Sequence, residues 1–139
     1  MLRILVTLLF LYFSCTTIDK TNRDKSIIEL ERTACFGNCP IYKIEIFSNG
    51  KVIYTGKKFV NNIGVFKFKI NTSSIKEILE YAEEIKFISM KDEYTRPVSD
   101  LPTTFVRIRT KSVKNHIGGP NSLRELEKMI DKVSQQITK

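Results

Sequence analysis

The hydrophobic residues of this chain follow two different periods, and the switch between them restricts the fold more than any other feature. Before residue 71, apolar and polar residues alternate, which is the pattern of a strand with one solvated face. Four segments show it: 26–33, 40–47, 51–55 and 65–70. Later in the chain, segments 103–110 and 112–117 return to strand character. We therefore expect about six strands.

Two segments instead repeat apolar residues every three or four positions, which is the period of an amphipathic helix. They cover residues 75–85 and 123–137. Capping boxes are offered by Ser74 with Glu77 and by Ser122 with Glu125. The element order predicts an α+β fold, β-β-β-β-α-β-β-α, in which an antiparallel sheet carries both helices on one face.

A Ser-Asn-Gly stretch separates the second and third expected strands. An Asn-Gly pair between β-rich runs is a strong signal for a two-residue hairpin, because both residues tolerate positive φ. A turn at Asn49 and Gly50 would place Ile46 opposite Ile53.

The first fifteen residues have the layout of a bacterial secretory signal that ends at a lipidated cysteine. Arg3 supplies a positive start, residues 4–13 are almost wholly apolar, and the small residue Ser14 stands directly before Cys15. The apolar run holds about ten residues, half of what a membrane-spanning helix needs. We therefore expect residues 1–14 to be a signal peptide and Cys15 to carry lipid.

The position three residues before Cys15 holds Tyr12, where lipoprotein signals carry an aliphatic residue. Two alternatives therefore stay open: ordinary cleavage near Thr16, and an uncleaved anchor. Residues 15–25 are polar and lack apolar spacing, which predicts a flexible tether. Residues 26–139 suffice for a single domain with one core. The expected location is the cell envelope, at the outer membrane or the periplasmic side of a membrane, with a soluble periplasmic or secreted protein as the alternative.

The chain has 23 basic and 15 acidic residues, a formal net charge of +8. Such a surplus favours anionic partners, and export argues against nucleic acid among them. Lys67 and Lys69 alternate with apolar residues, as do Arg107 and Arg109. If their strands are neighbours, the four cations form one basic sheet face that meets an anionic lipid or envelope polymer. The plainer interpretation is a lysine-rich solvated surface.

With Cys15 assigned to lipid, Cys35 and Cys39 remain as an even pair in an oxidising compartment. A disulfide needs Cα atoms about 4.4–6.8 Å apart, so the loop must turn back, which its glycine and Pro40 permit. We expect a structural disulfide. Thiol-redox catalysis stays open as an alternative, although redox pairs usually stand two residues apart. No metal or other cofactor is expected, because His116 is the only histidine and no haem attachment motif occurs.

Residues 87–101 form a long connection that contains Asp92 and Asp100. Loops often present functional residues, so an envelope hydrolase that uses this loop is a further alternative. The plainer interpretation is that Asp100 caps backbone amides in a turn before the next strand. His116 is expected as an ordinary residue at a strand end.

The run from Cys35 to Tyr42 reads Cys-Phe-Gly-Asn-Cys-Pro-Ile-Tyr. It resembles an uncharacterised bacterial domain-of-unknown-function family with a Cys-Phe-Gly-x-Cys-Pro-x-Tyr signature, whose members are often predicted lipoproteins. The likeness also covers residues 30–32, the Gly-Lys-x-Phe-Val element at 56–60, and the Asp-Leu-Pro-Thr-Thr element at 100–104. The resemblance implies an α+β module with a paired-cysteine corner and no established catalytic residue.

These patterns together predict an exported, lipid-anchored envelope protein that acts as a non-catalytic binding or structural module. Its expected partners are the membrane, through lipid at Cys15, and an anionic envelope component. The candidate binding residues are Lys67, Lys69, Arg107, Arg109 and Asp100. The sequence indicates no oligomeric state.

Overall fold

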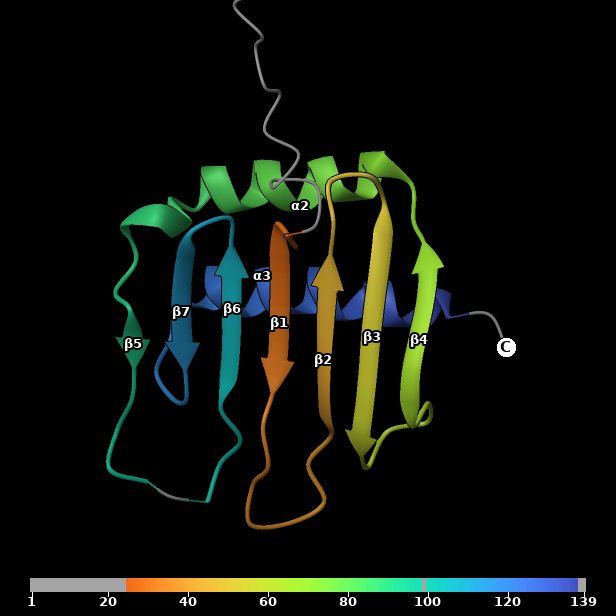
Figure 1. Cartoon of the computed structure of the whole chain (residues 1–139). Coiled ribbons are helices and arrows are strands. Elements are labelled where there is room, and N and C mark those ends of the chain that lie inside the picture. The colour runs from red at the N-terminus through yellow and green to blue at the C-terminus, as the bar shows by residue number, and fades with distance from the viewer. Residues whose placement is uncertain (1–24, 99, 138–139) are drawn as a thin grey trace, which may run out of the picture.

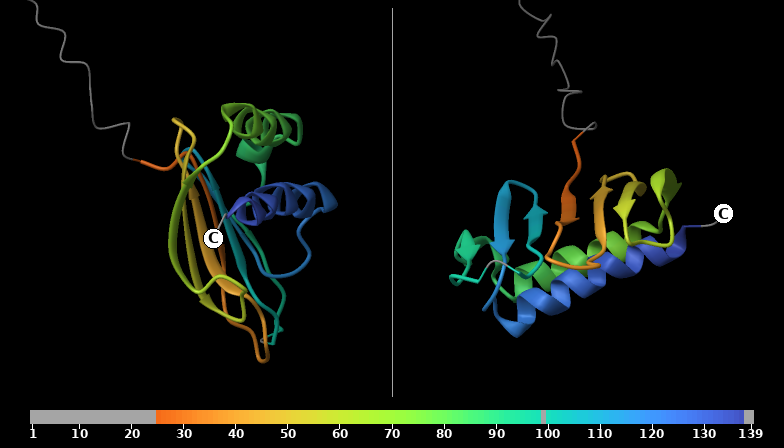
Figure 2. Two further views of the ribbon diagram at one scale, coloured as in Figure 1. Left: turned by 90° about the vertical axis from the view of Figure 1, so that its right-hand side faces the viewer. Right: turned by 90° about the horizontal axis from the view of Figure 1, so that it is seen from below.

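A computed structural model describes residues 25–98 and 100–137. A seven-stranded sheet and two α-helices form two layers, with both helices on the same face of the sheet (Figures 1 and 2). The strands are β1 (Ile28–Arg32), β2 (Ile41–Ile46), β3 (Lys51–Lys58), β4 (Gly64–Lys69), β5 (Glu93–Tyr94), β6 (Thr104–Ile108) and β7 (Lys111–Asn115). The helices are α2 (Thr72–Glu84) and α3 (Asn121–Asp131), each followed by a short 3-10 helix, η3 (Phe87–Ser89) and η4 (Lys132–Gln136).

The strands lie in the order β4-β3-β2-β1-β6-β7-β5. Neighbours are antiparallel except β5 and β7, which run parallel. The expected α+β class is confirmed, but the sheet is mixed and has seven strands rather than six. The additional strand, β5, lies inside the connection at 87–101. It is two residues long, which is too short to show a hydrophobic period.

The core lies between the inner face of the sheet and the helices. Strands β2 and β3 alternate buried and half-buried residues over most of their length, so each presents one face to the core. The largest fully buried side chains are Ile28, Leu30, Ile44, Ile46, Val52, Val106, Val113, Leu123, Leu126 and Ile130. Among the described residues, no helix has the length and apolar character needed to cross a membrane.

The hairpin between β2 and β3 differs from its expected register. Ile46 pairs with Val52 rather than Ile53, which keeps both members of the pair on the buried face. The loop is longer than two residues, because the Phe47 N–H donates to the Lys51 carbonyl at 2.9 Å. Gly50 adopts a φ of 85°, whereas Asn49 does not take a positive φ, so the expected turn does not form.

The helix starts also differ from expectation. Asn71 caps α2, and its side-chain oxygen accepts a hydrogen bond from the Ser73 N–H at 3.0 Å. Pro120 precedes α3 without a side-chain cap. Each helix begins before the serine of its expected capping box, so Ser74 and Ser122 lie inside the helices and neither is the N-cap.

The two ends of the sheet have different connections (Figure 1). The β1–β2, β3–β4 and β5–β6 connections lie at the lower end, which we call the loop end. The chain enters β1 at the opposite end, beside the β2–β3 and β6–β7 turns, and we call this the entry end. Helix α2 crosses the sheet near the entry end (Figure 2).

Gly56 permits the β3–β4 loop to fold back onto the sheet. A Cβ at this position would overlap the backbone oxygen of Asn62, and backbone cannot move aside as a flexible side chain can. We expect Gly56→Ala to lower the free energy of unfolding by about 1–3 kcal/mol, the usual cost of forcing atoms into a packed site. Urea denaturation measures this loss.

Gly37→Ala is the matched control, because its added Cβ would lie 3.8 Å from the nearest atom, the Cys35 sulfur. We expect this variant to unfold at nearly the wild-type urea concentration. Equal stability of the two variants would contradict the close approach at Gly56.

Candidate functional site

A cavity of about 450 Å³ opens at the loop end of the sheet. The start of β2, the β3–β4 loop, η4 and Ile137 contribute to its walls. Its lining residues are Pro40, Tyr42, Tyr54, Phe59, Val60, Asn61, Asn62, Ser134, Gln135 and Ile137. We call this cavity the loop-end groove. Its lining includes three aromatic residues and three residues with side-chain amides.

The aromatic part of the groove has a fixed floor and an exposed rim. Tyr42 and Tyr54 stack on the floor with ring centroids 5.7 Å apart, and both are largely buried. Phe59 stands at the rim with 42% of its surface exposed. The Lys58 ammonium lies 4.8 Å from the centroid of the Phe59 ring, a cation–π contact. Phe59 is therefore the ring available to a ligand.

A polar cluster lies behind the groove and connects three strands to α3. The guanidinium of Arg32 on β1 is 2.5 Å from Asp131, and it donates to the Tyr42 hydroxyl at 3.0 Å and to the Thr104 hydroxyl at 2.9 Å. The Tyr42 hydroxyl donates in turn to Asp131 at 2.5 Å. We call these four residues the Arg32 cluster. Each of its hydrogen bonds crosses between different elements of the fold.

Burial and charge act together on this cluster. Burial raises the pKa of Tyr42, and the hydrogen bond to Asp131 raises it further because it holds the phenolic proton. Burial alone would lower the pKa of Arg32, but the hydrogen bond and charge of Asp131 outweigh it and raise this pKa. Arg32 therefore stays charged and Tyr42 stays neutral over the whole physiological pH range.

Glu127 extends the cluster along α3. It is 5% exposed, its carboxylate lies 3.7 Å from Arg32, and it accepts a hydrogen bond from the Asn115 amide at 2.7 Å. Burial raises the pKa of Glu127 above its usual range. His116 follows β7, as expected of a strand-end residue, and its Nε2 is buried without a partner among the described residues.

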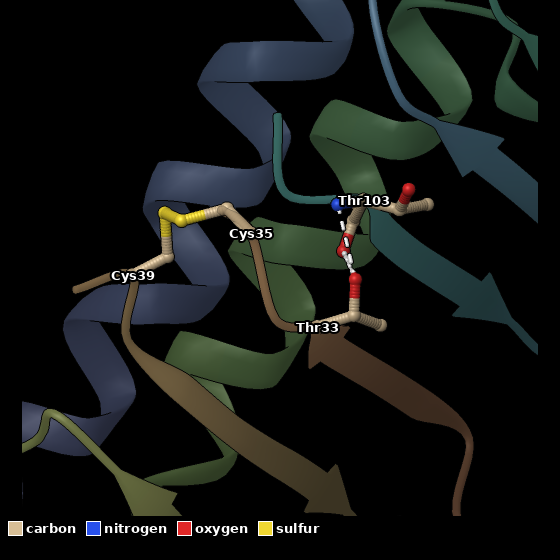
Figure 3. The surroundings of a disulfide bond; sticks show 4 residues. All are labelled: Thr33, Cys35, Cys39 and Thr103. Atoms are coloured by element: carbon tan, nitrogen blue, oxygen red, sulfur yellow. Dashed lines mark hydrogen bonds between the residues drawn. A yellow bond between two sulfur atoms is a disulfide. The ribbon is translucent and has the colours of Figure 1, made fainter. Parts of the chain in front are cut away.

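The cysteine loop lies beside the groove at the loop end. Cys35 and Cys39 lie at disulfide distance, with Cα atoms 5.7 Å apart, and form a disulfide (Figure 3). Thr33 ties the adjoining chain to Thr103, because its hydroxyl both donates to the Thr103 carbonyl and accepts from the Thr103 N–H, each at 3.1 Å. This loop presents Phe36 with 93% of its surface exposed.

The expected loop acids do not gather at one place. Asp92 pairs with Lys111, and Glu93 pairs with Lys114 at 2.9 Å. Asp100 instead lies beside the cysteine loop, where its carbonyl accepts a hydrogen bond from the Phe36 N–H at 3.3 Å. No group of three or more potential metal-binding side chains occurs within residues 25–98 and 100–137.

The four candidate cations also fall into separate places. Lys67 and Lys69 lie on β4, with three strands between it and β6, which carries Arg107. Arg107 is bound to Glu29, and its guanidinium donates to the Ser26 hydroxyl at 2.8 Å. Arg109 follows β6 and faces Glu83 of α2 at 3.8 Å. The strands are not neighbours, so these residues form no single basic face.

The sequence patterns do not predict the loop-end groove or the Arg32 cluster. The elements that carry the family resemblance nevertheless meet here, since they contribute Arg32, Tyr42, Phe59 and Thr104. The one local signal for the cluster is Glu127, an acid inside the apolar stripe of α3. No sequence pattern marks Asn61, Asn62 or Gln135 as residues of a binding site.

The Tyr42 hydroxyl gives the cluster a direct test. Tyr42→Phe removes a donor to Asp131 and an acceptor for Arg32, so we expect the free energy of unfolding to fall by about 1.5–3 kcal/mol, the range for hydrogen bonds to charged groups. Tyr54→Phe is the control, because no hydrogen bond of the Tyr54 hydroxyl occurs among the described residues, and it should cost little. Thermal unfolding of both variants separates the outcomes, and equal losses would contradict the cluster.

Comparison with known proteins gives a family but no activity. No curated protein matches the chain. A family model described as a domain of unknown function, DUF6438, matches residues 26–134 and so covers every strand and α-helix of the described fold. The chain is a member of the DUF6438 family of domains of unknown function.

Proposed function

We propose that this protein is an exported, lipid-anchored and non-catalytic binding module of the cell envelope. The disulfide between Cys35 and Cys39 supports the proposed use of the cysteines, because it leaves only Cys15 for another role. Cys15 itself lies outside the described residues. A chain with one lipid-type cysteine and one disulfide suits an oxidising compartment.

The loop-end groove is the observation that carries the binding role. Of the described residues that line it, only Tyr42 and Tyr54 are titratable. Acid–base catalysis needs a group that gives or takes a proton near neutral pH. The Tyr42 proton is committed to Asp131, and burial raises the pKa of Tyr54 as well. Amides and an exposed aromatic ring instead suit a neutral ligand with hydroxyl groups, such as an envelope glycan.

The position of the groove fits a tethered domain. The described chain begins at the entry end (Figure 1), whereas the groove is lined by the β3–β4 loop at the loop end. A tether of residues 16–25 reaches at most about 35 Å. A domain held in this way would present its groove away from the bilayer, toward ligands in the envelope.

Thiol-redox catalysis has less support. Redox cysteines are usually activated by a helix N-terminus or a nearby cation. Neither α2 nor α3 begins at the cysteine loop, and β2 begins two residues after Cys39. The disulfide is better explained as a brace for the corner between β1 and β2.

A second candidate function rests on an uneven distribution of charge. On the outer face of the central strands, Lys43 and Arg107 are paired with carboxylates. On β3 and β4, by contrast, Lys51, Lys67 and Lys69 have no ion-pair partner among the described residues, and Lys51 stands directly opposite Lys69. Like charges in that position repel, so an anionic polymer at this basic corner would gain from relieving the repulsion.

Metabolic labelling with a fatty acid tests the anchor. We expect the wild-type protein to incorporate the label and Cys15→Ala to lose it, because the thioether to lipid requires that sulfur. Cys35→Ala is a control for general thiol acylation and should retain the label. Labelling of Cys15→Ala, or none of the wild type, would contradict the proposal.

Retention on isolated cell-wall polysaccharide distinguishes the groove from the basic corner. If the groove binds, Phe59→Ala should reduce retention by about fivefold or more, the loss of one aromatic contact worth about 1 kcal/mol. Phe105→Ala is the matched control, since Phe105 is 41% exposed on β6 and lies outside the groove.

Salt and charge reversal supply the other arm of this experiment. Binding at the basic corner should weaken in salt and disappear with Lys67→Glu combined with Lys69→Glu. Lys76→Glu with Lys128→Glu changes the net charge equally on the helices and serves as the control. Retention that no variant alters would contradict both candidate sites.

A further inference from the structure

The entry end of the fold carries a second hollow that the proposed ligand groove does not use. A cavity of about 470 Å³ lies between the end of α2, η3 and the β6–β7 turn. A neighbouring cavity of about 370 Å³ lies between α2 and Ile27, and Leu79, Glu83 and Arg109 line both. We call the two cavities together the entry-end hollow. Its floor is largely apolar, with Leu79, Ala82, Phe87 and Ile108 in the larger cavity.

The residues around η3 have the composition of a membrane-contacting segment. Ile88 lines the larger cavity, and 69% of its surface is exposed. Lys86 and Lys91 stand on either side of it in sequence, and neither has an ion-pair partner among the described residues. An exposed apolar residue between lysines can enter the lipid interface while the ammonium groups stay at the head groups.

The other charges of the hollow are already matched. Arg109 faces Glu83 at 3.8 Å, Lys111 pairs with Asp92, and Lys76 pairs with Glu80 at 3.5 Å. Among the described residues, Lys86 is therefore the cation at the larger cavity that has no ion-pair partner. Lys86 has a φ of 54°. This backbone conformation is unfavourable for any residue other than glycine, so the surrounding fold must stabilise it.

The start of the described chain places this surface beside the tether. The Arg109 N–H, in the β6–β7 turn, donates to the Ile27 carbonyl at 2.7 Å, and Ile27 lines the smaller cavity. Residues 1–24 therefore join the domain next to the hollow. Membrane attachment in those residues would therefore start from this end of the fold, which favours its contact with the bilayer over contact by the loop end.

We propose that the entry-end hollow docks the domain on an anionic phospholipid bilayer, with Ile88 and the apolar floor taking up acyl chain and Lys86 contacting a lipid phosphate. The proposal rests on the proposed membrane anchoring for its orientation. The test uses the uncleaved chain, so that its apolar run at residues 4–13 can attach it to a vesicle without lipid at Cys15. Only protein that floats with the vesicles is measured, so docking is tested separately from lipidation.

The absence of tryptophan from the chain allows a clean probe. Ile88→Trp places a fluorophore at the hollow, and Ile63→Trp places one in the β3–β4 loop at the loop end, where the native side chains are 69% and 68% exposed. We call these two variants the hollow probe and the loop-end probe. Each full chain is reconstituted in vesicles of phosphatidylcholine and phosphatidylglycerol with brominated acyl chains. We expect brominated lipid to quench the hollow probe but not the loop-end probe, and the emission of the hollow probe to shift to the blue.

Charge removal tests the role of the lysine. Lys86→Asn, made in the hollow probe, keeps a residue that tolerates positive φ, and it should lower the ratio of docked to undocked protein about fivefold, the effect of one lysine at an anionic surface. Lys67→Gln removes one charge on β4 and should change nothing. With vesicles that lack phosphatidylglycerol, the ratio of docked to undocked hollow probe should fall as it does for Lys86→Asn.

Three results would overturn docking at the hollow. Equal quenching of the two probes would mean that the domain has no preferred orientation. No quenching of the hollow probe would mean that the hollow stays off the bilayer even when the chain is attached to it. A blue shift of the hollow probe without vesicles would mean that protein, and not lipid, fills the cavity.

Discussion

The guanidinium of Arg32 joins the two layers of the fold at the loop end. It reaches from β1 to Asp131 on α3, a residue 99 positions later, and the same group contacts Tyr42 on β2 and Thr104 on β6. A half-buried cation of this kind is costly without partners, because part of its hydration is lost on folding. The position of α3 against the sheet, and with it the wall of the loop-end groove, depends on these contacts.

The sequence predicted what periodicity can encode. Both helices, the fold class and six of the seven strands follow from local spacing, and the disulfide follows from the even pair of cysteines that remains once Cys15 is set aside. The register of the β2–β3 hairpin could not be predicted from the spacing. It depends on the length of the loop and on the burial of Val52 opposite Ile46. The paired charges did not follow either: Asp131 meets Arg32 only when α3 returns across the sheet, and no spacing along the chain records that contact. The prediction of a single basic face was wrong for the same reason: spacing along the chain does not show which strands are neighbours, and three strands separate β4 from β6.

Backbone strain and hollows coincide in this structure. Phe59, Lys86 and Arg109 are the residues other than glycine that adopt positive φ within the described chain, with values of 53–55°. Phe59 lines the loop-end groove, and the other two line the entry-end hollow. Such a conformation costs on the order of 1 kcal/mol at each position. Lys86 directly follows the C-cap of α2 and Arg109 lies in the β6–β7 turn, two places where the left-handed conformation reverses the chain. The fold thus concentrates its strain at two opposite ends.

Lys51 on β3 and Lys69 on β4 face each other, and the charge at this edge of the sheet affects how neighbouring molecules associate. Strand β4 is an open edge of the sheet, and an open edge invites pairing with the edge of another molecule. Two copies that met edge to edge would bring Lys67 and Lys69 of each against the same residues of the other. The repulsion that weakens one hairpin therefore protects many neighbours from joining into an extended aggregate, a benefit that grows when molecules are concentrated on a surface.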